Sequence, residues 1–191
     1  MILEGLVTTC DSEGRVNVAP MGPIVDDAGL DGPELTLRPF SGSTTYRYLR
    51  ETGRGVFHVT DNVLLLARAA VSHVEDVPLA PIKDFPVPRL VDCCRWRAFA
   101  VSEADWEERA TVRTSPVVDG RVRDYFGLNR AKHAVVEATI LATRLHLTGP
   151  EEVRRELDRL TPLIEKTAGS QEREAFELIE WHVDGWPGTT E

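Results

Sequence analysis

The segment Leu37–Tyr46 combines hydroxyl groups, a glycine and an arginine in an order that suits phosphate binding. A hydrophobic strand ends near Arg38, and a turn containing Gly42 leads into Ser43-Thr44-Thr45 at the start of an expected helix. The first turn of a helix has unpaired N–H groups and the positive end of the peptide dipole, so it attracts anions. The pattern predicts a site for a phosphate-bearing cofactor at Arg38, Ser43, Thr44 and Thr45, with Arg38 supplying a forked cation.

The same residues have a simpler structural interpretation. Serine and threonine are strongly preferred immediately before a helix, where the side-chain oxygen accepts a backbone N–H. Ser43 would then only cap the helix Thr45–Thr52. The local pattern leaves both interpretations open.

The second strand, Arg15–Val25, forms an expected hairpin with Leu3–Cys10 around the turn composition of Asp11–Gly14. Pro20 and Gly22 interrupt its alternating pattern, since proline donates no ladder hydrogen bond and glycine packs no side chain. We expect the ladder to break there and the strand to face a ligand. An edge strand blunted against aggregation is the alternative.

Composition limits the partners and the compartment. Thirty-one acidic and 22 basic residues give a net charge of −9, which argues against nucleic acid and against a membrane surface. The N-terminus resembles no signal peptide, and no apolar run approaches the length of a bilayer span. We therefore expect a cytoplasmic protein.

The titratable sulfur and imidazole groups show no metal-ligand spacing. The three cysteines include an adjacent pair that cannot form an unstrained disulfide, so reduced thiols are expected. We predict no metal site and expect packed or surface roles for the histidines. These are His58, His73, His133, His146 and His182.

Further along the chain, periodicity predicts alternating strands and helices. The expected elements are a strand at Glu34–Arg38, the helix at Thr45–Thr52, a strand at Gly55–Thr60, a helix at Val63–Val71 capped by Asp61, and strands at Cys93–Ser102 and Trp106–Val118. The stretch His73–Val91 carries four prolines, Pro78, Pro81, Pro86 and Pro88, and we expect it to lack a regular ladder.

The C-terminal third has helical periodicity. Three helices are expected: one from Leu128 to about Leu145 with Asn129 near its start, one over Glu151–Lys166 that Pro162 should kink or end early, and one over Gln171–His182. A β-rich front followed by helices indicates an α+β protein, and about six strands can close into a small barrel. We expect a barrel core at residues 1–127 and a helical extension at 128–191, packed on the barrel as one structural unit.

Five segments resemble a known family. Ile2–Thr9, Asn17–Pro23, Leu37–Tyr46, Thr60–Leu64 and Asn129–Ala138 look like the blocks of domain-of-unknown-function family 447, which belongs with the flavin-reductase-like FMN-binding split barrels. The resemblance implies a six-stranded split β-barrel with a C-terminal helical extension. It also implies a homodimer with FMN in a groove at the subunit interface, and it favours the phosphate interpretation over the cap.

The resemblance also implies positions for the cofactor. The phosphate would lie at Arg38, Ser43, Thr44 and Thr45, and the ring edge along the segment that contains Asn17, Ala19, Pro20, Met21 and Gly22. Thr60, Asp61 and Asn62 would lie near the ring or ribityl chain, and Asn129, Arg130 and Lys132 would reach the same groove. A cation such as Arg130 or Lys132 would stabilise reduced flavin.

Three functions remain open. The first is an FMN-dependent oxidoreductase or flavin reductase that meets NAD(P)H or a small acceptor transiently, since no Gly-x-Gly-x-x-Gly turn is present. The second is a non-catalytic dimer that binds or senses flavin or deazaflavin. The third, a structural dimer without ligand, leaves the hydroxyl turn and Arg38 unexplained.

Overall fold

A computed structural model describes residues 1–72, 74 and 76–187. Packing divides the chain into two compact units: residues 1–60 with 76–125, and the described residues of 61–75 with 126–191. We expected residues 61–75 in the barrel core and the boundary after residue 127. The reason for the difference is the helix at 63–71, which packs against the C-terminal helices. Packing of the extension on the barrel stays a prediction.

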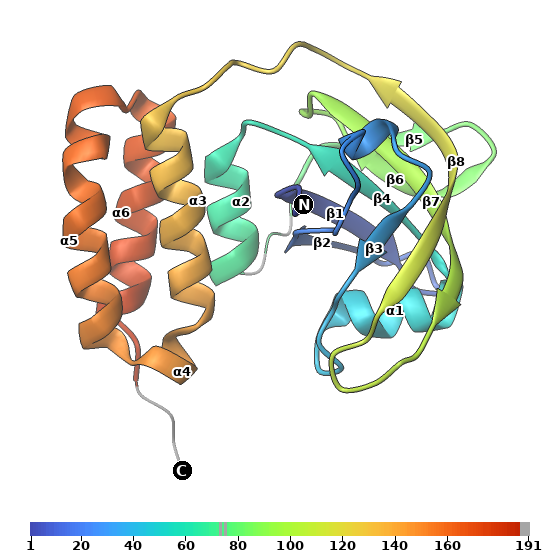
Figure 1. Ribbon diagram of the computed structural model, residues 1–191, viewed down its shortest axis with the longest axis horizontal. Helices are drawn as coiled ribbons and strands as arrows, with labels where there is room; N and C mark the ends of the chain where they lie inside the picture. Colours follow the sequence, from blue (N-terminus) through green and yellow to red (C-terminus); the bar gives the residue numbers. More distant parts are fainter. Residues whose placement is uncertain (73, 75, 188–191) are drawn as a thin grey trace. The chain divides into compact units, whose positions relative to one another are not determined.

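The first unit is built on a curled, fully antiparallel sheet (Figure 1). Apolar and β-branched residues are common in these strands, and successive side chains point to opposite faces of the sheet. In spatial order they are β2 (Val16–Met21), β1 (Gly5–Cys10), β4 (Arg54–Val59), β7 (Arg95–Ala104), β8 (Val112–Arg121) and β3 (Leu35–Leu37).

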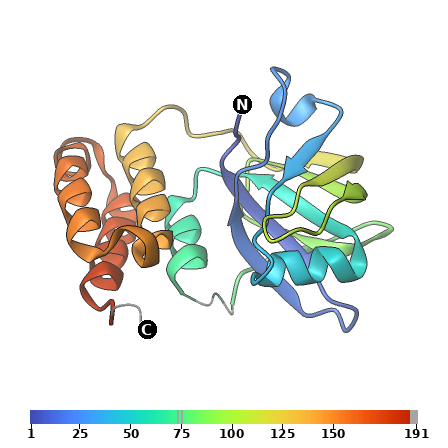
Figure 2. The same ribbon diagram turned by 60° about the horizontal axis from the view of Figure 1, so that its bottom comes forward.

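The core inside the curl contains Val7, Leu37, Phe57 and Phe99, all fully buried or nearly so. Helix α1 (Thr44–Thr52) closes this side and contributes Leu49 to the same core; Figure 2 shows it beside the strands. A short 3-10 helix, η1 (Gly29–Asp31), precedes β3. Because α1 begins right after the β3 segment, the hydroxyl turn is held at the edge of a packed core.

The opposite face of the sheet is covered by a hairpin that we did not expect. The prediction of an irregular stretch at His73–Val91 is wrong for most of its length, because β5 (Leu79–Ile82) pairs with β6 (Phe85–Leu90). His73 itself lies outside the described residues. Ile82 and Val87 pack on Cys10, Val56 and Ala98 of the main sheet.

The second unit consists of helices, of which α2, α3, α5 and α6 lie side by side (Figure 1). Alanines on α3 let the helices approach closely, and larger residues such as Leu157, Phe176 and Ile179 fill the core. The bounds are α2 (Val63–Val71), α3 (Arg130–Thr143), α4 (Leu145–Thr148), α5 (Pro150–Thr167) and α6 (Ser170–Asp184). Helix α5 continues past Pro162, so the expectation of an early end is wrong.

Candidate functional site

Ser43 is the N-cap of α1. Its Oγ accepts a hydrogen bond from the Tyr46 N–H at 3.1 Å and donates to the Phe40 carbonyl at 2.8 Å. The structural interpretation of Ser43 is therefore confirmed. A hydroxyl has a single proton, so Ser43 could donate to a phosphate only after releasing Phe40. Its role in phosphate binding stays a prediction.

Thr44 and Thr45 supply the remaining hydrogen-bond donors of the first turn of α1. The N–H groups of Tyr46 and Arg47 already bond to Ser43, whereas in the described chain nothing accepts from the N–H groups of Thr44 and Thr45. The half-buried Thr44 hydroxyl also has no partner among the described residues. These are the donors that an anion could use without breaking an existing bond.

Arg38 and Gly42 border this turn. Arg38 is exposed, and within the described residues it forms no ion pair. Gly42 is exposed as well, and a Cβ added there would meet no atom within 4 Å. The start of α1 is thus preceded in the chain by an exposed cation and by a glycine with open space around it.

The strand β2 meets the start of α1 through one hydrogen bond. The Asn17 side-chain amide donates to Thr45 Oγ1 at 3.1 Å, which places two of the predicted cofactor segments in contact. Thr45 is buried, and its hydroxyl still has its own proton to donate because it accepts from Asn17.

The expectation that the β2 ladder breaks is wrong. Every position from Val16 to Met21 pairs with β1, Pro20 opposite Leu6. The strand lies at the edge of the sheet, where a proline is tolerated when its nitrogen points outward. The edge-strand interpretation is confirmed. Ala19 and Met21 pack on the core, so the outer main chain of β2 is its ligand-accessible feature.

Thr60, Asp61 and Asn62 follow β4, and the last two belong to the helical unit. Asn62, not Asp61, caps α2: its Oδ1 accepts from the Leu65 N–H at 3.0 Å. Asp61 lies one residue too early for that bond. Its carboxylate accepts instead from the Phe126 N–H at 2.6 Å.

Asn129 and Lys132 also have structural partners. Asn129 caps α3, with Oδ1 accepting from the Lys132 N–H and the amide donating to the Thr167 carbonyl. The buried Lys132 ammonium donates to Glu172 at 2.7 Å, to the Asp61 carbonyl at 2.8 Å and to Gln171 at 3.3 Å.

An ammonium group has three protons, so Lys132 keeps none for a flavin. Burial raises the pKa of the Glu172 carboxyl, but hydrogen bonds from Lys132 and from the Gly169 N–H outweigh burial and lower it. The predicted flavin role does not fit Lys132. Arg130 is exposed, and its role stays a prediction.

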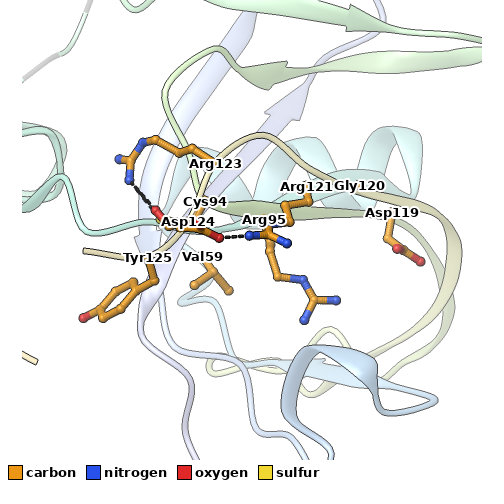
Figure 3. A pocket seen from close by; sticks show the side chains of 9 residues that line it. All are labelled: Val59, Cys94, Arg95, Asp119, Gly120, Arg121, Arg123, Asp124 and Tyr125. Carbon is orange, nitrogen blue, oxygen red and sulfur yellow. Dashed lines mark hydrogen bonds and ion pairs between the residues drawn. The ribbon is translucent and has the colours of Figure 1, made fainter. Parts of the chain in front are cut away.

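The barrel unit also contains a hollow that sequence reasoning missed. It has a volume of about 430 Å³ and lies where β4 and β8 end and β7 begins (Figure 3). Val59, Cys94 and Tyr125 are among the residues that line it, together with three arginines, Arg95, Arg121 and Arg123. The strand pairing, which the sequence does not reveal, is what brings these arginines together.

Comparison with known families gives a match over most of the chain. Residues 3–123 match the N-terminal domain of the family described as "protein of unknown function (DUF447)", and residues 129–180 match a second domain of DUF447. The chain belongs to the DUF447 family. The resemblance seen in the sequence is therefore confirmed. No curated protein matches this DUF447 chain.

Solved structures extend the comparison to the fold. An FMN-bound DUF447 protein from Methanosarcina mazei superposes with a TM-score of 0.81 at 23% identity, over 95% of this chain and 94% of that one. The flavin reductase of styrene monooxygenase from Pseudomonas putida S12 gives a TM-score of 0.53 at 16% identity, over 64% and 82%.

A putative flavin reductase with a split barrel domain from Shewanella frigidimarina gives a TM-score of 0.51 at 14% identity, over 62% and 66%. Structural similarity at these levels of sequence identity shows a shared fold and nothing more. They confirm the predicted α+β split barrel with C-terminal helices for this DUF447 chain.

The part of the chain that the structure describes contains neither a candidate membrane span nor a candidate metal centre. Within residues 1–72, 74 and 76–187, no helix combines the length and the apolar character that crossing a bilayer requires. In the same residues, His, Cys, Asp and Glu side chains do not gather into a group that could hold a metal ion.

Proposed function

We propose that this DUF447 protein binds FMN on its barrel unit, with the phosphate at the start of α1 and the ring along the outer edge of β2. The hydrogen bond from Asn17 to Thr45 carries the proposal, because it joins the two segments beside the exposed Arg38. The FMN-bound DUF447 relative, which this chain matches over 95% of its length, supports the same cofactor.

The residues at this place fit the chemical groups of FMN. A phosphate can take the unused N–H groups of Thr44 and Thr45, the Thr44 hydroxyl and the Arg38 guanidinium without breaking a hydrogen bond of the fold. An edge strand offers outward main-chain donors and acceptors, which suit the polar edge of a flavin ring. Bound flavin supplies hydride and one-electron transfer, and the chain holds and orients it.

Substitution of Arg38 tests the phosphate position. In Arg38→Gln, we expect the FMN affinity to fall about 10-fold or more, because a charge-assisted hydrogen bond contributes about 1.5–3 kcal/mol. Riboflavin, which lacks the phosphate, should bind wild type and variant equally. Isothermal titration calorimetry of both ligands measures the difference.

Arg47→Gln is the matched control. Arg47 is exposed on α1, but its guanidinium lies over the Tyr48 ring, 5.3 Å from the centroid. Its removal should leave FMN affinity unchanged. Equal FMN affinity in wild type and Arg38→Gln would remove the phosphate assignment, as would an equal loss for riboflavin.

We further propose that the protein is an oxidoreductase or flavin reductase acting with NAD(P)H or a small acceptor. Its fold is that of flavin reductases, and a nicotinamide partner would bind transiently. Bleaching of the FMN-loaded protein by NADH or NADPH without oxygen is the expected result. If the flavin bands persist with both donors, the alternative of a flavin or deazaflavin binding or sensing protein takes its place.

The cofactor groove is proposed to lie between two copies of the chain. Exposed apolar side chains on the barrel unit support a second copy: Val117 is 54% exposed, Ile24 43% and Val118 38%. In addition, β3 pairs with β8 only from Val112 to Thr114, so among the described residues no strand lies beside the outer edge of β8 beyond Thr114. Such an edge suits pairing with another chain.

A further inference from the structure

The hollow where β7 begins is lined by three arginines. Arg95 on β7 lies directly opposite Arg121 on β8, and Val59 on β4 is opposite Arg95 on its other side. Residues in direct register point to the same face of a sheet. Like charges in that position destabilise a strand pair, so the placement of Arg95 and Arg121 calls for a negative partner.

The carboxylates that now face these arginines are solvent-exposed, and Asp31 is held by two hydrogen bonds, both from Arg95. Arg95 pairs with Asp31, Arg121 with Asp124, and Arg123 with Asp92. In the Arg121–Asp124 pair the side chains are 65% and 82% exposed. Exposed pairs contribute little and are screened by salt, so a ligand oxyanion can take the place of such a carboxylate. Figure 3 shows Asp124 between Arg121 and Arg123.

A buried guanidinium lies next along the same face of β7. Arg97 is only 6% exposed, and its Nη1 donates to the Gly32 carbonyl at 2.5 Å. Its Nε is buried without an acceptor among the described residues, and no carboxylate there forms an ion pair with it. Buried charges in proteins are normally paired. The cross-strand neighbour of Arg97 on β8 is Asp119, which lines the hollow, so Arg97 brings a buried positive charge to this face of the sheet opposite a single carboxylate.

We propose that this hollow is a second anion site, separate from the start of α1, and that it takes a small organic molecule carrying a phosphate or carboxylate group. Arg95 and Arg121 bind the oxyanion as planar forks, since guanidinium matches the geometry of both groups. Val59 and the Tyr125 ring supply the apolar surface for the rest of the molecule. The proposal goes beyond FMN binding and does not depend on it.

Titration of the full chain saturated with FMN tests the site, because the α1 position is then filled. The probes are inorganic pyrophosphate and benzoate, measured by isothermal titration calorimetry at low salt. We expect at least one probe to bind, with affinity falling about 10-fold in Arg121→Gln and falling again as salt is added. Preference for pyrophosphate assigns a phosphorylated ligand, and preference for benzoate a carboxylate.

Arg113→Gln is the matched control. Arg113 is exposed on the same strand and faces Glu34 and Glu103 outside the hollow. Its removal should not change probe binding, and Arg121→Gln should bind FMN like wild type. The second site is overturned if neither probe binds, or if Arg113→Gln loses as much affinity as Arg121→Gln. Failure of the FMN proposal would appear separately, as absent FMN binding in wild type.

Discussion

His58 is the buried titratable side chain whose surroundings most restrict its charge. Its ring lies between two main-chain groups: Nδ1 is 3.2 Å from the Leu6 carbonyl, and Nε2 accepts from the Leu90 N–H at 3.1 Å. This fixes a neutral ring that donates from Nδ1. Burial lowers the pKa of His58 to about 3, and the nearby Arg89 adds to the effect.

Acid should therefore destabilise the barrel unit through His58. The ordinary pKa is 6.5, so between pH 6.5 and about 3 the unfolded chain binds the proton more tightly than the folded one. As the pH is lowered through that window, the free energy of unfolding should decrease by up to about 1.4 kcal/mol per pH unit. Urea unfolding from pH 7 to pH 4 measures the slope.

His58→Gln should remove this slope, whereas the exposed His146 gives a control, His146→Gln, that retains it. An identical pH dependence in wild type and His58→Gln would show that other groups cause the acid sensitivity.

The second residue with a definite energetic role is Lys132. Its ion pair with Glu172 is almost completely buried, at 9% and 8% side-chain exposure. Removing one partner of such a pair leaves an uncompensated buried charge. We expect Lys132→Met to destabilise the helical unit by about 3–5 kcal/mol, measured by urea unfolding followed by circular dichroism.

Lys132→Met/Glu172→Leu should recover most of the loss, because both charges are then gone. FMN affinity of the folded double variant should equal that of wild type. A selective loss of FMN affinity in the folded double variant would show that Lys132 does take part in binding the cofactor.

At the scale of elements, prolines explain most of the differences from expectation. Pro162 lies within α5 and is exposed, and the helix nevertheless runs on to Thr167. The apolar face of α5, with Leu157 and Ile164 in the core, holds the helix together across the missing hydrogen bond.

Pro162→Ala should consequently stabilise the helical unit by roughly 1–3 kcal/mol, because the variant regains a helical N–H and loses the steric clash. Thermal unfolding followed at 222 nm is the measurement. Pro150→Ala is the control: Pro150 begins α5, where proline is well tolerated, so little change is expected. A lower melting temperature in Pro162→Ala would mean that Pro162 makes a packing contribution we have missed.

The hairpin of β5 and β6 could not be predicted for a related reason. Its paired positions include Leu79 with Leu90 and Ile82 with Phe85, and Pro81 falls at the irregularity between Ala80 and Ile82. A two-stranded ribbon has a free outer edge on each strand, which accommodates prolines. Only tertiary contacts, such as the hydrogen bond from Thr8 Oγ1 to the Pro88 carbonyl, reveal that the segment is ordered.

Local sequence patterns were sufficient to predict the helices and strands that depend on neighbouring residues alone. The first hairpin, α1 and α2 follow from alternation, turn composition and caps, although the expected break of the β2 ladder was wrong and the cap of α2 was placed one residue early. The site was harder to predict. The contact between Asn17 and Thr45 joins residues far apart in the sequence, and the arginines of the hollow meet only through strand register.

At the scale of the whole molecule, the proposal of a groove between two copies has a direct consequence for mass in solution. Light scattering after size exclusion should give about twice the chain mass of 21.3 kDa. Val117→Glu should shift the population toward single chains, because it places a charge on the exposed apolar edge of β8. The exposed Val122→Glu tests for a general solubility effect. A wild-type mass of one chain would contradict the proposal.

The helical unit is discontinuous in sequence, so its helices are synthesised at widely separated times. Helix α2 leaves the ribosome early, yet its partner on α6 comes much later: Arg68 and Glu174, which form an ion pair, are 106 residues apart. Until α6 emerges, the apolar side of α2, including Val63 and Ala67, has no complete core to enter. The nascent protein therefore exposes the apolar side of α2 while β5, β6, β7 and β8 of the barrel unit are synthesised.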